Sequence, residues 1–323
     1  MLKRIVIIFL LLVVVIPVFS WGFFAHKLIN RVAIFTLPEE LFLFYKNNIE
    51  YITEHATDAD MRRYSDPDEG SRHYIDLDYY ETTTPIDTVP FYWKAAIEKY
   101  TEDTLKAYGI VPWYINLMKF KLTEAFNEKN VPNILRYSAE IGHYIGDAHV
   151  PLHTTENYNG QLTGQHGIHA FWESRLPELF ANGYDFFVGK ATYIDNVQKA
   201  AWLACEGSYS AKDSVLQFEQ QLNNSYSVDR KYSNEQRGQN MVKVYSKEYS
   251  EAYHTMLNNQ VERRMRDAVL MIGSIWYTAW VDAGQPDLGA EKSTELTDEE
   301  RKEMLSEQMK IMNEKKMIGR PEN

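Results

Sequence analysis

The segment HYIGDAHVPLH, residues 143–153, places three histidines and an aspartate in an otherwise apolar helical pattern. His143 and Asp147 are four residues apart, so on a helix they lie on one face, one turn from each other. Burial of imidazole and carboxylate groups costs free energy unless the groups are paired or bind a metal. A helix that carries them toward the core therefore predicts a fold built around bound metal.

A second pair of side chains repeats this spacing. His169 and Glu173 lie four residues apart in GIHAFWESRL, and His153 follows Pro151 just past the expected end of the first helix. Zinc takes nitrogen and oxygen ligands at about 2.0–2.2 Å in four-coordinate geometry, so these side chains suit it. One such pair is more typical of a helix surface, but two pairs and a further histidine in apolar surroundings favour a metal site.

Helical periodicity also dominates elsewhere in the chain. Apolar residues recur on one helical face in Leu117, Phe120, Leu122 and Phe126, and again in Ile134, Tyr137, Ile141 and Tyr144. A long helical stretch is expected from about Gln239 to Ala283, where Gly284 and Pro286 stop it. Strand signals are scarce and strands do not alternate with helices. The pattern predicts an all-α fold.

The first twenty residues are expected to be a secretory signal peptide. Lys3 and Arg4 precede an almost wholly apolar run, and Ser20 supplies a small residue at the cleavage position. The run is short for a helix that spans a bilayer, although an uncleaved N-terminal anchor is the alternative. Cleavage before Trp21 predicts a secreted or periplasmic chain without a transmembrane segment in its mature part.

The remaining chain is expected to form one helical domain, residues 21–288, followed by a strongly charged tail, residues 289–323. Residues 64–92 and the glycine-rich residues 157–167 are expected to be irregular. The net charge of -11 gives no general electrostatic footprint for nucleic acid, so a phosphate-bearing partner would have to meet a local cationic centre such as bound metal. Cys205 is the only cysteine, which excludes an internal disulfide and predicts a small buried side chain.

Three further segments offer metal-binding groups. HATDADMRRY contains Asp60 and Arg63, and SRHYIDLD contains His73, although an acid beside arginines is more often part of a salt-bridged turn. His26 follows Trp21 by five residues. A free α-amino group and the carbonyl of the same residue can chelate a metal, and only a processed N-terminus offers that pair; the simpler interpretation of Trp21 is an interfacial aromatic on the first helix.

Together these motifs resemble the superfamily of tri-zinc phosphoesterases that includes zinc-dependent phospholipase C and the S-one/P-one nucleases. The matching order is an N-terminal Trp, a His, an Asp, a His, H-x-x-x-D, a further His and H-x-x-x-D/E, and it runs through nearly all of the mature chain to about residue 173. The resemblance implies a multi-helix domain with three zinc ions at the base of a cleft. It implies hydrolysis of P–O ester bonds by a metal-activated hydroxide.

The resemblance also assigns roles to individual residues. The first zinc is expected to be held by Asp60, His73, His143 and Asp147, the second by His153, His169 and Glu173, and the third by Trp21 and His26, with Asp147 bridging the first and third. Asp58 is the alternative to Asp60. Arg63, Asp60 and Asp147 are the expected catalytic residues, with Arg63 steadying the phosphate. His55, His149 and His166 are expected outside the metal ligands, and Asp76 and Asp78 are expected to orient His73.

The resemblance divides over the substrate. The W-x-x-x-x-H start and GDAHVPLH look like the nucleases, whereas the short gap from His153 to His169, the final Glu173 and the absence of a Gly-Gly-Asn segment look like the phospholipases. A phospholipase C-like phosphodiesterase is the first expectation, and a nuclease acting on single-stranded DNA or RNA is the alternative. Neither requires a protein partner.

Two interpretations from other classes are a non-catalytic, zinc-stabilised helical binding protein and a surface adhesin. Structural zinc sites are closed by four protein ligands, often sulfur, whereas the second set here has three ligands and leaves room for water or substrate. This difference favours an enzyme.

Overall fold

The computed structural model describes residues 22–80, 88–237 and 240–289 of the chain. The expected signal peptide, Trp21 and the charged tail from residue 290 onward lie outside these residues. The described part is built almost entirely of helices, which confirms the all-α class.

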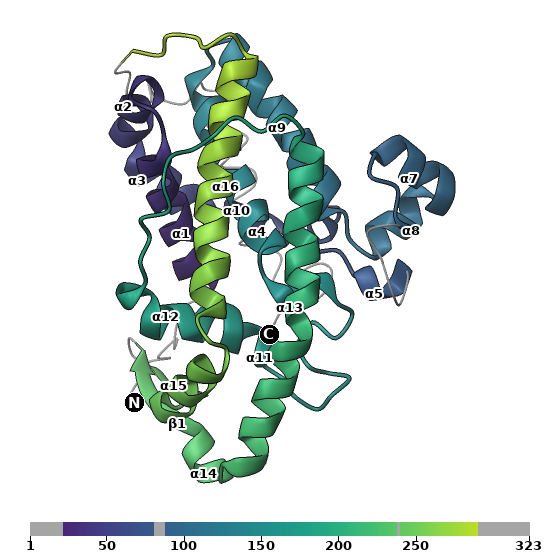
Figure 1. Cartoon of the computed structure of the whole chain (residues 1–323), viewed down its shortest axis with the longest axis vertical. Helices are drawn as coiled ribbons and strands as arrows, with labels where there is room; N and C mark the ends of the chain where they lie inside the picture. Colours follow the sequence, from purple (N-terminus) through teal and green to yellow (C-terminus); the bar gives the residue numbers. More distant parts are fainter. Residues whose placement is uncertain (1–21, 81–87, 238–239, 290–323) are drawn as a thin grey trace, which may run out of the picture.

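Four long helices form the body of the molecule: α9 (Val111–Asn127), α10 (Val131–Ala148), α13 (Val197–Ser225) and α16 (Gln260–Asp282). They run along the long axis of the molecule (Figure 1), and α10 packs against α9 and α16. The first helix, α1 (Gly22–Ala33), packs against both α10 and α16. Two segments far apart in the sequence therefore meet on α10, the helix that carries the HYIGDA motif.

Local sequence signals explain where the long helices begin. The side chain of Asn130 accepts a hydrogen bond from the backbone N–H of Asn133, and that of Asn196 accepts one from Lys199. These bonds satisfy donors that have no partner within the helix. A proline stands in the first turn of α9 and of α10, where its missing N–H is not needed.

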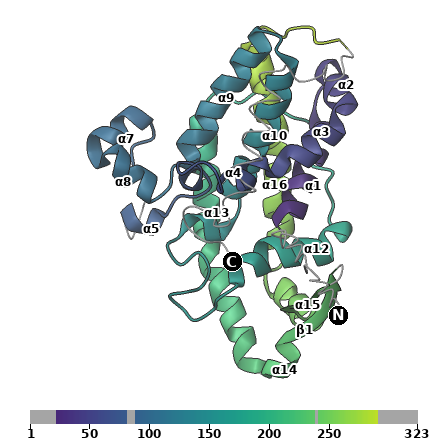
Figure 2. The same ribbon diagram turned by 180° about the vertical axis from the view of Figure 1, so that it is seen from behind.

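Shorter helices surround this body, and their bounds are α2 (Glu39–Asn47), α3 (Ile49–Glu54), α4 (Asp58–Arg62), α5 (Leu77–Tyr80), α7 (Trp93–Tyr100), α8 (Glu102–Ala107), α11 (Ile168–Ala170), α12 (Leu176–Phe180), α14 (Val228–Lys231) and α15 (Lys247–Met256). The helices α7 and α8 project to one side, as both views show (Figures 1 and 2). Short 3₁₀ turns follow α3 at His55–Thr57 and α10 at Pro151–Thr154. Among the described residues, none of the helices combines the length and apolar character needed to span a bilayer.

The expected face of α9 is only partly correct. Leu122 and Phe126 are fully buried, but Leu117 and Phe120 are 48% and 57% exposed. The reason is that α13 and α16 cover α9 on the side of Leu122, while Leu117 and Phe120 line an open pocket on the other side. On α10 the expected face is buried at Ile134, Ile141 and Tyr144, with Tyr137 partly exposed.

The expected helix from about Gln239 to Ala283 is wrong at its start, and it is interrupted near its middle. The structure has an antiparallel hairpin, β1 (Tyr232–Arg237) and β2 (Asn240–Tyr245), with Tyr232 opposite Tyr245. The helices α15 and α16 follow, and Asn258 and Asn259 separate them with left-handed φ values of 47° and 59°. Asparagine tolerates this conformation better than most residues, so the pair breaks a pattern that looked continuous. The predicted stop is correct, since α16 ends at Asp282.

Candidate metal centre

The two His–acid pairs of the sequence lie on neighbouring helices inside the body of the molecule. His143 and Asp147 are on the core side of α10 and are 0% and 1% exposed. His169 lies on α11, and Glu173 lies on the π-helical turn Phe171–Arg175 that continues it. Such widened turns are rare and occur frequently at functional sites. His153 lies in the 3₁₀ turn after α10, so the chain returns it to the same centre.

One group of ligand atoms surrounds the end of the His143 side chain. His143 Nε2 lies 3.1 Å from His73 Nδ1, and Asp147 Oδ2 lies 3.3 Å and 2.9 Å from these two nitrogens. Asp60 Oδ1 lies 3.5 Å from His143 Nε2 and 3.7 Å from His73 Nδ1. The four residues expected to hold the first zinc are thus brought together, and α4 supplies Asp60 from the opposite side.

A second group contains the three residues expected at the second zinc. His153 Nε2 lies 3.1 Å from His169 Nε2, and Glu173 Oε2 lies 2.7 Å from His169 Nε2 and 3.4 Å from His153 Nε2. These atoms are close enough to bind one ion together. The donors are two nitrogens and one carboxylate, which leaves a coordination position open in a four-coordinate site.

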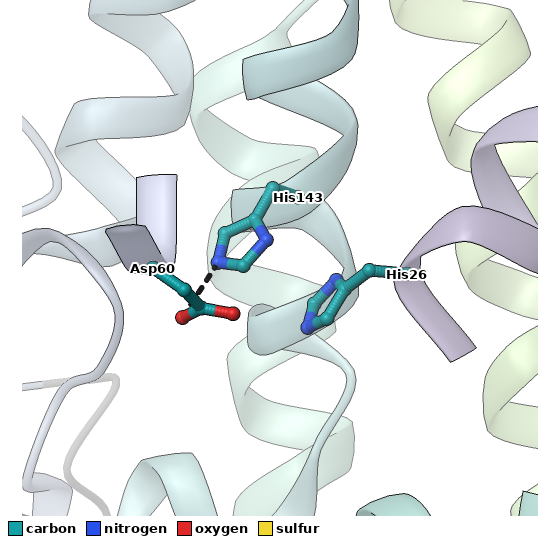
Figure 3. Close-up of side chains that lie close together, drawn as sticks. All are labelled: His26, Asp60 and His143. Atoms are coloured by element: carbon teal, nitrogen blue, oxygen red, sulfur yellow. Dashed lines mark ion pairs between the residues drawn. The ribbon is translucent and has the colours of Figure 1, made fainter. Parts of the chain in front are cut away.

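His26 on α1 connects the two groups. Its Nε2 atom lies 3.3 Å from Asp147 Oδ1 and 3.5 Å from Glu173 Oε1, and its ring stacks on that of His143 with centroids 4.0 Å apart. Figure 3 shows His26 and Asp60 approaching His143 from two sides. Because Asp147 presents Oδ2 to the first group and Oδ1 to His26, its position suits a bridging ligand.

Glycines allow α1 to lie this close. A Cβ atom at Gly146 would come within 2.8 Å of His26 Nδ1, and one at Gly22 within 2.7 Å of Glu173 Oε1. Gly22, the first residue of α1, therefore lies directly beside the second group of side chains. This is where the N-terminal ligand pair of Trp21 is expected, although Trp21 itself lies outside the described residues.

The charges in the centre support one another. Burial by itself would raise the pKa of the Asp147 carboxyl, but His143 and His153 hold it well below its usual range. Burial would likewise lower the pKa of His143, yet Asp147 and Asp60 raise it well above the ordinary value. The buried carboxylates thus require positive charge, which either protons on the histidines or a metal ion can provide. The most exposed ligand side chains are Asp60 at 18% and Glu173 at 11%, so solvent reaches the centre beside them.

The structure also decides between some of the alternatives. Asp58 pairs with His55 at 2.7 Å and is 46% exposed, so Asp60 and not Asp58 joins the centre. His166 is exposed. His149 is buried, and its Nδ1 atom donates to the backbone oxygen of Ile145 at 2.8 Å; burial, with help from Arg264, lowers its pKa to about 3.

Arg63 caps α4 one turn after Asp60 and is 1% exposed, so its expected contact with a phosphate stays a prediction. Asp78 accepts hydrogen bonds from the hydroxyl of Thr155 and the backbone N–H of Glu156, which places its carboxylate on the loop after His153. On the far side of the His73 ring, Nε2 lies 3.3 Å from Oε1 of Glu69. Glu69 was not expected, although it precedes His73 by the same four residues that separate the other pairs.

The chain was compared with known proteins. No family model matches it. It is 27% identical over 214 residues to Nuclease S1 of Aspergillus oryzae, and the match covers 60% of this chain and 66% of that protein, just under two thirds of its length. A solved structure, Alpha Toxin from Clostridium Absonum, aligns with a TM-score of 0.45 and 13% identity over 79% of this chain and 63% of that one, which is too low to support a conclusion. The sequence match, together with the clustering of the motif residues, confirms that the chain resembles the tri-zinc phosphoesterase superfamily.

Proposed function

We propose that this protein is a secreted, zinc-dependent phosphodiesterase that hydrolyses P–O ester bonds. The observation that carries the proposal is the gathering of eight buried or nearly buried histidine, aspartate and glutamate side chains into overlapping groups, which are linked because His26, His143, Asp147 and Glu173 each belong to two of them. The sequence match to a nuclease adds independent support for phosphodiester chemistry.

The donor set fits zinc. Imidazole nitrogens and carboxylate oxygens are zinc ligands, and magnesium or calcium would prefer an all-oxygen set. His26 Nδ1 is buried and makes no hydrogen bond within the described residues, so this ring depends on its Nε2 atom for a strong polar contact. A closed structural site would use four protein ligands, whereas the His153, His169 and Glu173 group offers three.

We assign the ligands to the ions according to the groups of neighbouring side chains described above. Asp60, His73, His143 and Asp147 would hold one ion, His153, His169 and Glu173 a second, and His26 with the amine and carbonyl of Trp21 a third. When bound, zinc supplies positive charge for the phosphoryl oxygens and lowers the pKa of water from 15.7 toward about 7. The three-ion count and the part of Trp21 belong to the proposal.

The residues of the chain would do the remaining work. Burial raises the pKa of Asp60, but His143, His73 and His26 lower it overall, so this carboxylate is ionised at neutral pH. As the most exposed ligand side chain, Asp60 is placed to accept a hydrogen bond from a water molecule that enters from solvent. Arg63, one turn further along the chain, is proposed to donate to the phosphate as negative charge develops. Asp147 would hold its two oxygens toward different ions.

Two substrate classes are carried forward because each has an observation in its favour. The short segment between His153 and His169 and the final Glu173 favour a phospholipid, as in a phospholipase C. The match to Nuclease S1 favours single-stranded nucleic acid. The acidic net charge of -11 weakens non-specific attraction to a polyanion but does not prevent contact at a cationic metal centre.

The deciding experiment presents both substrates to the processed protein with and without a chelator. Release of phosphocholine from phosphatidylcholine vesicles supports the phospholipase, and release of nucleotides from single-stranded DNA or RNA supports the nuclease. His153→Asn should abolish chelator-sensitive turnover, while the matched control His166→Asn, at an exposed position, should leave it unchanged. Zinc bound without activity on either substrate would contradict the enzyme and favour a zinc-stabilised binding protein.

The proposed third ion gives a separate test. Gly22, the first described residue, lies directly against Glu173, and the proposal assigns the amine of a chain that begins at Trp21 to this ion. One extra residue in front of Trp21 would remove the free amine from this position, so we expect the extended chain to bind one zinc fewer, measured by metal analysis after dialysis. An extended form with an unchanged zinc content would contradict the part assigned to Trp21.

A further inference from the structure

Four of the five histidines in the proposed metal centre are held in two different ways. Three of them turn Nδ1 toward a backbone oxygen and leave Nε2 for the centre. These contacts are His143 to Ala56 at 2.9 Å, His153 to His73 at 2.6 Å and His169 to Tyr158 at 3.1 Å. A ring held in this way has its tautomer and orientation set by the backbone.

His73 is held in the opposite sense. Its Nδ1 atom faces the centre, 2.9 Å from Asp147 Oδ2, and its Nε2 atom points away from it. Behind the ring, Nε2 lies 3.3 Å from Glu69 Oε1, and no backbone oxygen takes its place among the described residues. A carboxylate there attracts the Nε2 proton, which keeps Nδ1 unprotonated and free to bind a metal.

Glu69 is itself held on all sides. It is 0% exposed. Its Oε2 atom accepts hydrogen bonds from Arg62 Nε at 3.2 Å and from Arg72 Nη1, while the hydroxyl of Tyr144 donates to Oε1. These three donors compensate for the burial of a carboxylate.

The same contacts connect the three segments that carry the first group of ligands. Arg62 follows Asp60 by two residues and donates to Glu140 at 2.7 Å and to the Tyr144 hydroxyl at 3.1 Å. Tyr144 is next to His143 on α10, and Arg72 is next to His73. Arg62 and Arg72 face Glu69 and Glu140, and Arg72 also donates to Asp66 at 3.0 Å, so the network holds two arginines and three carboxylates.

We propose that Glu69 is a positioning residue for the metal centre. Its carboxylate holds the His73 ring with Nδ1 toward the ion. It also binds Arg62 and Arg72, which connect the segments that carry Asp60, His73 and His143. The inference rests on the proposed zinc centre. A merely structural ion-pair network would make the same contacts with the arginines but would not require a carboxylate against the His73 ring.

A pair of matched variants separates these two roles. Glu69→Gln and Glu140→Gln each remove one negative charge from the network, but only Glu69 contacts His73. In a competitive chelator titration of the folded holoprotein, we expect Glu69→Gln to weaken binding of one zinc about 10–100-fold, and Glu140→Gln to change it by less than about threefold. Circular dichroism of the metal-free variants checks that both fold.

A measurement on the unmodified protein keeps the inference testable even if a variant does not fold. In zinc-loaded protein, ¹⁵N–¹H spectra of the histidine rings should show the His73 proton on Nε2, shifted downfield by the carboxylate and protected from exchange. A proton on Nδ1 would overturn the inference. Equal zinc affinities of the two variants would also overturn the inference, but would not contradict the proposed zinc centre. A wild-type chain that binds no zinc would instead contradict the proposed function itself.

Discussion

At the scale of single residues, Cys205 shows how burial controls reactivity. Its thiol is 0% exposed, and burial raises its pKa to about 12, although Arg264 opposes the shift. At pH 8 only about one thiol in ten thousand is then ionised, and the thiolate is the reactive form. We expect Cys205 in the native protein to resist iodoacetamide at pH 8 and to react fully in guanidinium, as measured by mass spectrometry. Rapid labelling of the native chain would contradict its burial.

The raised pKa of Cys205 also predicts a pH dependence of stability. The folded pKa is above the ordinary value of 9.0, so the unfolded chain loses its proton first as the pH rises. The stabilisation is complete below about pH 9 and is lost between pH 9 and about 12. Between pH 8 and pH 10, the free energy of unfolding should fall by roughly 1.4 kcal/mol more for the wild type than for Cys205→Ala. Parallel urea titrations measure the difference, and identical pH slopes would count against it.

Single residues are also where the sequence was most informative about the site. The four-residue interval placed His143 with Asp147, and His169 with Glu173, because this spacing on a helix fixes the relative direction of two side chains. Asp60, His73 and His153 were expected from the resemblance, and the part of all these residues as metal ligands stays a prediction. Glu69 has the same interval to His73 but lies in a segment expected to be irregular, where spacing carries no direction. The choice of Asp60 over Asp58 required the structure, since both are plausible from the sequence.

At the scale of elements, the close approach of α1 to α10 depends on Gly142. A Cβ atom there would lie 2.0 Å from Asn30 Oδ1, and Asn30 is fully buried with its Nδ2 donating to the backbone oxygen of His26 at 3.0 Å. We expect Gly142→Ala to lower the free energy of unfolding by about 1–3 kcal/mol and to reduce zinc binding by displacing His26. The control is Gly183→Ala, which meets no atom within 4 Å and should change stability by less than about 0.5 kcal/mol. A neutral Gly142→Ala would show that α1 can shift without cost.

The hairpin is the second element that supports the centre. The Tyr245 ring stacks on that of Phe171, with centroids 3.8 Å apart. In the sequence, Phe171 lies between the proposed ligands His169 and Glu173. Arg175, which is 5% exposed, donates to the backbone oxygen of Tyr245 at 3.1 Å and to Glu235 at 3.0 Å.

Replacing Arg175 by methionine should therefore free the hairpin from the ligand-bearing turn. We expect a loss of about 1–3 kcal/mol and faster hydrogen exchange of the β1 and β2 amides. Lys243→Gln, on the exposed face of β2, is the control and should leave exchange unchanged. Unaltered exchange in the Arg175 variant would mean that ring stacking alone holds the hairpin.

The elements that the sequence did not predict have a common cause. In β2 and α15 the residues Met241, Tyr245, Tyr249 and Tyr253 recur every four positions, which is a helical interval, but Tyr245 belongs to a strand. Its ring is used for a contact with Phe171, which lies far away in the sequence. The spacing of apolar and aromatic residues indicates local geometry only. A contact with a distant residue that stabilises a strand therefore cannot be predicted from this spacing.

At the scale of the whole molecule, the expected metal ligands lie inside the helical body. The class could be predicted because helical patterns and helix stops cover most of the chain. Of the expected ligands, His143, Asp147, His169 and Glu173 could be placed by helical spacing, whereas His73 and His153 lie in or beside short turns. The expected domain limits at residues 21 and 288 stay predictions, since the segments beyond them are outside the described residues. What remains to be tested at this scale is the share of stability that bound metal provides.

Removal of zinc should destabilise the entire fold, because three carboxylates and five imidazoles would then lie together in the interior without the charge that balances them. A ligand present at 1,000 times its dissociation constant stabilises the native state by about 4.1 kcal/mol, which in a domain of this size raises Tm by on the order of 10 °C. We expect chelator-treated protein to melt lower by at least that amount.

Added zinc should restore the Tm, and magnesium should not, because the donors include nitrogen. The loss should grow below about pH 6, where protons compete with zinc for the histidines. The contrary outcome is an unchanged Tm in protein that metal analysis has shown to be free of zinc. It would mean that protonated histidines alone neutralise the buried carboxylates. The opposing pKa shifts of His143 and Asp147 allow this in part.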